Sequence, residues 1–127
     1  MKRFLVFAVA GLAWTTANAQ IDEEEFVVVL PDDAQKCVLP ASPDSIPDDA
    51  TLEQLKAAKA DVAAFQQKVA EFRQCLDTAN SNPDNTSGNK QAIVESYNYS
   101  VEMEERVANR FNEAVRAYKE RKAAAEG

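Results

Sequence analysis

The feature of this sequence that most restricts its fold is a seven-residue repeat of apolar side chains that begins near position 51. Two rows follow the repeat, and the second lies three residues after the first. Lys, Glu, Asp and Gln fill most other positions, a pattern typical of a helix that packs along another helix. The repeat predicts a long helix over residues 51–79. Its first row contains Leu55, Val62, Val69 and Leu76, and its second row contains Ala58, Phe65 and Phe72.

Local signals mark both ends of this helix. Thr51 and Gln54 have the spacing of a capping box, in which the Thr hydroxyl covers a free backbone N–H and the Gln side chain reaches back. The stretch NSNPDNTSGN, residues 80–89, is dense in residues that form turns. The helix is therefore expected to begin at the capping box and to end near the start of this stretch.

A second apolar repeat follows the turn and predicts a helix over residues 89–124. Because the loop between the two helices is short, they are expected to pack antiparallel. The predicted fold class is all-α, an antiparallel and coiled-coil-like hairpin of two helices over residues 51–127. The rows expected to form the seam of the second helix are Val94, Val101, Ala108 and Val115, and then Tyr97, Phe111 and Tyr118.

Glu104 interrupts this second seam, and a further apolar row lies beside it. A charged residue at a seam position either reaches out to water or specifies the register and the partner of the helix. The neighbouring row contains Ile93, Val107 and Ala114, with Met103 close by. We predict a possible interaction face at Ile93, Met103, Glu104 and Val107. This face has three alternative binding partners: another segment of the chain, a second copy of the chain, or an unknown protein.

The first residues have the pattern of a secretory signal peptide. Lys2 and Arg3 precede an apolar run over residues 4–14, and a small-x-small pattern ends at Ala19. We predict cleavage between Ala19 and Gln20. The alternative is a membrane anchor, but eleven apolar residues are fewer than the roughly 20 that span a bilayer. The expectation is a periplasmic protein without stable membrane insertion once the signal peptide is removed.

Removal of residues 1–19 makes the chain more acidic. The full sequence has 14 basic and 21 acidic residues and a net charge of −7. The signal peptide takes two basic residues and no acidic residue with it, so the net charge becomes −9. Because contacts with phosphates need clustered Lys and Arg, a nucleic-acid partner is not expected.

Two cysteines, Cys37 and Cys75, are predicted to form a disulfide. An even number of cysteines in an oxidising compartment favours pairing, and two cysteines allow one intramolecular bond. A redox or metal site is the alternative. The sequence contains neither a CxxC motif nor a histidine, so no metal and no cofactor are expected.

The acidic and proline-rich residues 20–50 are predicted to form an extended strap. Three prolines, at positions 40, 43 and 47, hold the chain extended and lack the N–H that a lone strand leaves unpaired. The helix from Thr51 to Cys75 rises about 36 Å. An extended chain from Cys37 to Thr51 reaches about 43 Å. The strap is therefore long enough to run back along the first helix to the disulfide. Within it, FVVVL, residues 26–30, fits either a strand or an extended segment on an apolar groove.

Several short motifs occur in order between residues 37 and 121. They are Cys37-x-x-Pro40, Ile46-Pro47-Asp48, Phe72-x-x-Cys75-Leu76, Met103-Glu104 and Phe111-Asn112. With these motifs the chain resembles a group of small exported bacterial proteins that has no established activity. The resemblance implies the architecture of a helical hairpin. Many members have Gly where this chain has Asp49, a difference that concerns the turn before the helix.

The residue types argue against an enzyme. General acid–base or nucleophilic chemistry needs a group that is activated near neutral pH. The chain has no histidine, and its clustered carboxylates, such as Glu102 and Glu105, are expected on an open helix face. The main hypothesis is a non-enzymatic periplasmic module with an interaction or structural role. A holdase-like periplasmic chaperone and a small acidic inhibitor of a basic hydrolase are the alternatives.

Overall fold

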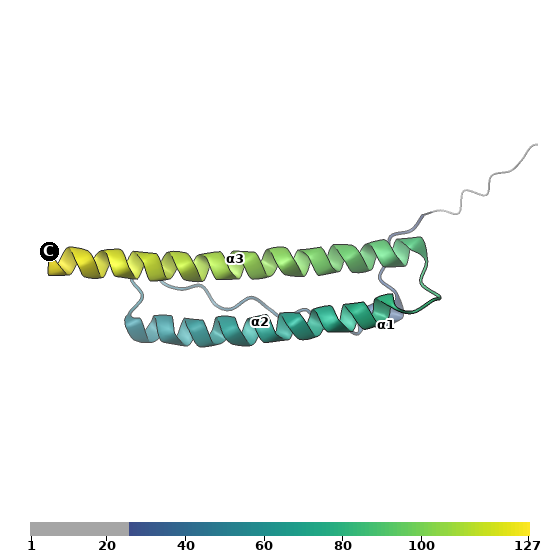
Figure 1. The fold of residues 1–127 in the computed structure, drawn as a ribbon, viewed down its shortest axis with the longest axis horizontal. Helices are drawn as coiled ribbons and strands as arrows, with labels where there is room; N and C mark the ends of the chain where they lie inside the picture. Colours follow the sequence, from purple (N-terminus) through teal and green to yellow (C-terminus); the bar gives the residue numbers. More distant parts are fainter. Residues whose placement is uncertain (1–25) are drawn as a thin grey trace, which may run out of the picture.

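A computed structural model describes residues 26–127 of the chain. It contains the short helix α1 (Asp32–Gln35) and two long helices, α2 (Leu52–Asn80) and α3 (Ser87–Glu126). The two long helices pack against each other and run in opposite directions (Figure 1). The described residues contain no strand, so the all-helical prediction is confirmed for them. The predicted cleavage site between Ala19 and Gln20 lies outside the described residues.

Capping boxes begin both long helices. Thr51 Oγ1 accepts a hydrogen bond from the Gln54 backbone N–H at 3.2 Å, and Gln54 Oε1 accepts one from the Thr51 N–H at 2.9 Å. This confirms the predicted start of α2. Thr86 and Asn89 form the same reciprocal pair at the start of α3. Because Thr86 is the cap, α3 begins at residue 87, two residues before the predicted start.

The two apolar rows of α2 face the core as predicted. Phe72 and Leu76 lie in a cluster at the end of α2 that leads into the turn, and Phe65 and Val69 lie in a second cluster farther along. Leu39 packs against both clusters. The core is therefore a narrow line between the two helices, closed in part by the chain that precedes α2.

The predicted seam of α3 is wrong by one residue in one of its two rows. Ile93, Ser100 and Val107 are buried, whereas Val94 is 53% exposed and the residues at seven-residue intervals after it are half-buried. The buried row precedes the aromatic row of Tyr97 by four residues, and the predicted row precedes it by three. Both spacings satisfy a helical repeat. Packing against α2 selects the first.

The short helix α1 lies within the segment that was predicted to be an extended strap. Pro31 has an extended backbone conformation and precedes Asp32 and Asp33 in the first turn. Carboxylates are favourable there because they interact with the free N–H groups of the helix. Ala34 faces inward and is buried against Phe72 and Leu76. One turn of helix therefore replaces the extended chain at residues 32–35.

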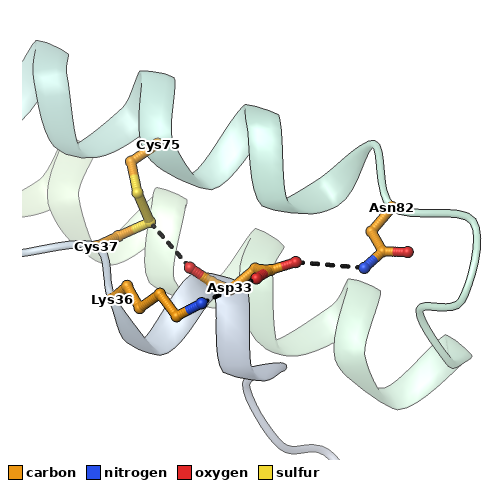
Figure 2. Close-up of polar contacts among 5 residues, drawn as sticks. All are labelled: Asp33, Lys36, Cys37, Cys75 and Asn82. Carbon is orange, nitrogen blue, oxygen red and sulfur yellow. Dashed lines mark hydrogen bonds and ion pairs between the residues drawn. A yellow bond between two sulfur atoms is a disulfide. The ribbon is translucent and has the colours of Figure 1, made fainter.

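Cys37 and Cys75 are joined by a disulfide, which attaches the chain after α1 to α2 (Figure 2). Their Cα atoms are 5.6 Å apart, in the ordinary range for this bond. On the other side of α1, Asn82 Nδ2 donates to Asp33 Oδ2 at 3.3 Å. Lys36 Nζ lies 3.3 Å from Asp33 Oδ1. A covalent bond and a polar bridge to the turn thus hold α1 at the end of the helix pair.

The connecting segment, residues 36–51, returns from α1 to the start of α2 alongside the two long helices (Figure 1). Pro40 and Ala50 are buried, and Ile46 is half-buried. Near the end of the segment, the Arg121 guanidinium of α3 donates to the carbonyl oxygen of Asp48 and, at 2.8 Å, to that of Ala50. The segment therefore contacts both long helices.

Candidate functional site

The prediction of an interaction face at Ile93, Met103 and Val107 is wrong. These side chains are only 3%, 8% and 6% exposed. Ile93 packs with the cluster of Phe72, whereas Met103 and Val107 pack with the cluster of Phe65. The row that was expected to need a cover is the row that α3 turns toward α2. These three residues stabilise the fold and are not accessible to a partner.

Glu104, the fourth residue of that predicted face, is engaged inside the helix pair. Its Oε2 lies 2.7 Å from Nη2 of Arg73, although Nη2 lacks the alignment of a hydrogen bond. Arg73 Nε donates to Ser100 Oγ at 2.9 Å, and this hydroxyl donates to the Tyr97 carbonyl oxygen at 2.6 Å. The Arg73 guanidinium also lies 5.5 Å from the centre of the Tyr97 ring. The charge that interrupts the seam is therefore neutralised within the chain.

The most exposed continuous apolar surface of the described chain lies elsewhere, at residues 26–29. The side chains of Phe26, Val27, Val28 and Val29 are 58%, 54%, 42% and 49% exposed. Four consecutive large apolar side chains are rarely left this open on a soluble monomer unless they bind something. We call these four residues the N-terminal segment.

Two contacts hold the N-terminal segment across the start of α3. Asn89 Nδ2 donates to the Val29 carbonyl oxygen at 2.8 Å. At Gly88 the two backbones meet so closely that a Cβ atom would lie 1.8 Å from the Val27 carbonyl oxygen. Only glycine permits this approach. Among the described residues the segment belongs to no helix or strand, and its apolar side chains are exposed.

An apolar groove of about 510 Å³ lies beside the N-terminal segment. Its floor includes Phe72 and Leu76 of the core, and Val28 and Tyr99 are among the residues that line its sides. Tyr99 is 50% exposed, and the Arg106 guanidinium lies 5.9 Å from the centre of its ring. The polar residues of the groove are Gln35, Glu95 and Ser96. The N-terminal segment and this groove form the candidate site.

The groups that line this site are apolar side chains and a few polar ones. Both cysteines are in the disulfide, and no group of three or more potential metal ligands comes together within residues 26–127. In the same part of the chain, neither long helix has an apolar stretch of the length needed to cross a membrane. The site is an apolar surface with a few polar groups beside it, which suits contact with an apolar part of another molecule.

The sequence pointed to part of this site. FVVVL was expected to be either a strand or an extended segment on an apolar groove. Residues 26–30 form no strand, and the first of them lie beside the start of α3. The roles of Gly88 and Tyr99 were missed. Only contacts between distant parts of the chain reveal these roles. No family model matches this chain, and the comparisons with curated proteins and with solved structures found no match.

Proposed function

We propose that this protein is a non-enzymatic interaction module that binds an extended apolar segment of another polypeptide at the N-terminal segment and the adjoining groove. One observation carries the proposal: four consecutive exposed apolar side chains lie beside a groove whose floor is the core. Burial of apolar surface is the main favourable term in most protein association. The two features together offer a partner more apolar contact than an isolated surface residue.

An extended partner suits the backbone of this site. Residues 26–29 are in no helix or strand, and the Val29 carbonyl oxygen already accepts a hydrogen bond from Asn89. A second extended chain can pair with the remaining backbone groups, as in binding by strand addition. Alternate side chains of such a partner would point to the same side. One of them would enter the groove between Val28 and Tyr99, while the next would point away.

The connecting segment acts as a strap in this proposal. The disulfide attaches it beside Phe72, and Arg121 attaches its far end to α3. A pair of helices alone has a thin core, and small scaffolds usually need a covalent or metal staple. The strap would keep Leu39 over both core clusters and so hold the floor of the groove in place.

Export to the periplasm is the second part of the proposal. It is supported by the signal-like residues 1–19, by the disulfide, and by the resemblance of residues 37–121 to small exported bacterial proteins. The test is the intact mass of the protein recovered from a periplasmic extract. We expect a chain that begins at Gln20 and that gains two mass units on reduction. An uncleaved chain in the cytoplasmic fraction would contradict export.

Binding is tested with a panel of short peptides that alternate valine or isoleucine with polar residues. We expect backbone amide NMR shifts at residues 26–30 and near Tyr99, and we expect Val28→Asp to remove them. Val38→Asp is the matched control, because Val38 is 80% exposed and lies in the connecting segment. Equal peptide binding by the wild type and Val28→Asp would show that the site is not used.

A holdase-like chaperone is the second candidate, and the apolar lining of the groove favours it. Such a lining does not discriminate strongly between apolar side chains. A holdase suppresses the aggregation of several unrelated unfolded clients, whereas an interaction module binds one partner with a fixed stoichiometry. Light scattering of two unrelated aggregating proteins, with and without this protein, separates the two functions.

A further inference from the structure

A second surface of the molecule lies on α3, away from the groove. Around a helix each residue turns by about 100°. Val94, Val101 and Ala108 therefore lie about 140–180° around the helix axis from Ala92, Tyr99 and Arg110, which line pockets beside the N-terminal segment or the connecting segment. Val94 is 53% exposed, and the other members of its row are half-buried. We call Val94, Val101, Ala108 and Val115 the outer row.

The charges of α3 are divided between its two halves. Residues 87–105 carry four acidic residues and one basic residue, whereas residues 106–126 carry six basic and three acidic residues. Glu104 is paired with Arg73, and Arg121 is bonded to backbone carbonyls. The other charged residues of α3 form no ion pair among the described residues. One end of the helix is thus acidic, the other is basic, and most of these charges have no ion-pair partner within residues 26–127.

A row of polar residues follows the outer row by four positions and repeats this asymmetry. It contains Glu105, Asn112 and Lys119, spaced by seven residues. Glu105 and Lys119 are therefore equally distant from Asn112, about 10 Å on either side of it along the helix. All three side chains are exposed. When two copies of this row are placed antiparallel with Asn112 at the centre, each acidic end lies opposite a basic end.

We propose that two copies of this chain associate through α3 in a dimer with two-fold symmetry, with the symmetry axis at Asn112. The antiparallel arrangement places Glu105 opposite Lys119 of the partner subunit, and the symmetry forms this pair twice. It also places Val115 beside the partner subunit's Ala108. The overlap runs from residue 98 to the end of α3, so Val94 lies outside it.

The charges select this orientation over the parallel one. A parallel dimer would set Glu105 against the same residue of the partner subunit and Lys119 against its own copy. Charges in the rows that flank an apolar row determine the orientation of paired helices. The N-terminal segment and the groove lie on another side of α3, so the dimer leaves the proposed binding site open.

Sedimentation equilibrium at several protein concentrations tests the proposal. We expect the wild type to form a dimer in the micromolar range and to dissociate more readily at high salt, which screens exposed charge pairs. Glu105→Lys and Lys119→Glu should each weaken the dimer on the order of tenfold, because each change places like charges together twice. The double variant should recover most of the affinity of the wild type, because it reverses both charges of each pair.

Two controls make the result decisive. Lys68→Glu changes an exposed charge on α2, near the connecting segment, and should leave the dimer unchanged. Val28→Asp should also leave it unchanged, which separates the dimer from the proposed peptide site. Circular dichroism checks that each variant is folded. A monomeric wild type, or a double variant that is as weak as the single variants, would overturn the proposal.

Discussion

Arg73 of α2 and Glu104 of α3 form an ion pair across the helix seam, with Nη2 and Oε2 2.7 Å apart. Their side chains are 20% and 27% exposed, so water reaches the pair only in part. Arg73 Nε also bonds to Ser100, whose side chain is fully buried. This relationship explains how a carboxylate occupies a position that the repeat reserves for an apolar side chain. The pair joins α2 to α3 across the seam.

The first prediction concerns this pair. Glu104→Leu removes the partner of a partly buried guanidinium and should lower the free energy of unfolding by about 1–3 kcal/mol, below the 3–5 kcal/mol typical of a fully buried pair. Adding Arg73→Leu should recover much of the loss, because no unpaired charge remains. Urea denaturation measures both effects. Glu113→Leu, at an exposed position of α3, is the control and should change stability by less than about 0.5 kcal/mol.

The disulfide gives the second prediction. Replacing Cys37 and Cys75 by serine removes a cross-link between residues that are 38 positions apart. In the chain-entropy model such a cross-link contributes about 4 kcal/mol, chiefly by restricting the unfolded chain. We expect a large fall in Tm and faster proteolysis within the connecting segment. If reduction leaves both the Tm and the cleavage rate of the wild type unchanged, the bond is not a structural staple.

The third prediction tests the phase of α3. Val107→Ala removes two buried methyl groups from the cluster of Phe65 and Met103 and should cost about 2 kcal/mol, counting the cavity that is left. Val94→Ala makes the same chemical change at a side chain that is 53% exposed and should cost less than about 0.5 kcal/mol. Thermal unfolding of the two variants compares them directly. Equal losses would favour the phase expected from the sequence.

The fourth prediction uses Gly88. In Gly88→Ala the new Cβ would lie 1.8 Å from the Val27 carbonyl oxygen, so the N-terminal segment must move away from α3. Alanine favours a helix over glycine by about 1 kcal/mol, so α3 itself should not be weakened. We expect faster hydrogen exchange and faster proteolysis at residues 26–30, with little change in the unfolding of the two long helices. Unchanged protection at residues 26–30 would show that the close contact is absent in solution.

The phase of α3 shows what the sequence left ambiguous. Two apolar rows, one starting at Ile93 and the other at Val94, both fit a helical repeat with the row of Tyr97. The second row has more large β-branched residues, so it was the natural choice from sequence. Ser100 makes the apolar pattern of the first row less clear, because it is polar. Its buried hydroxyl nevertheless has a partner, since it accepts a hydrogen bond from Arg73 of the other helix. A contact across the seam decided the phase.

By itself the sequence determined the two long helices, the capping box at Thr51, the turn between the helices, and the pairing of Cys37 with Cys75. The helices, the capping box and the turn depend on residues close together in the chain. The disulfide follows because the sequence has two cysteines, which allow one intramolecular pairing. Tertiary structure decided which face of α3 is buried, the helical turn α1, and the approach of Val27 to Gly88. Each of these depends on contacts between residues far apart in the chain. The free energy of such contacts exceeds the weak local preferences of the backbone, and the contacts leave no periodic pattern in the sequence.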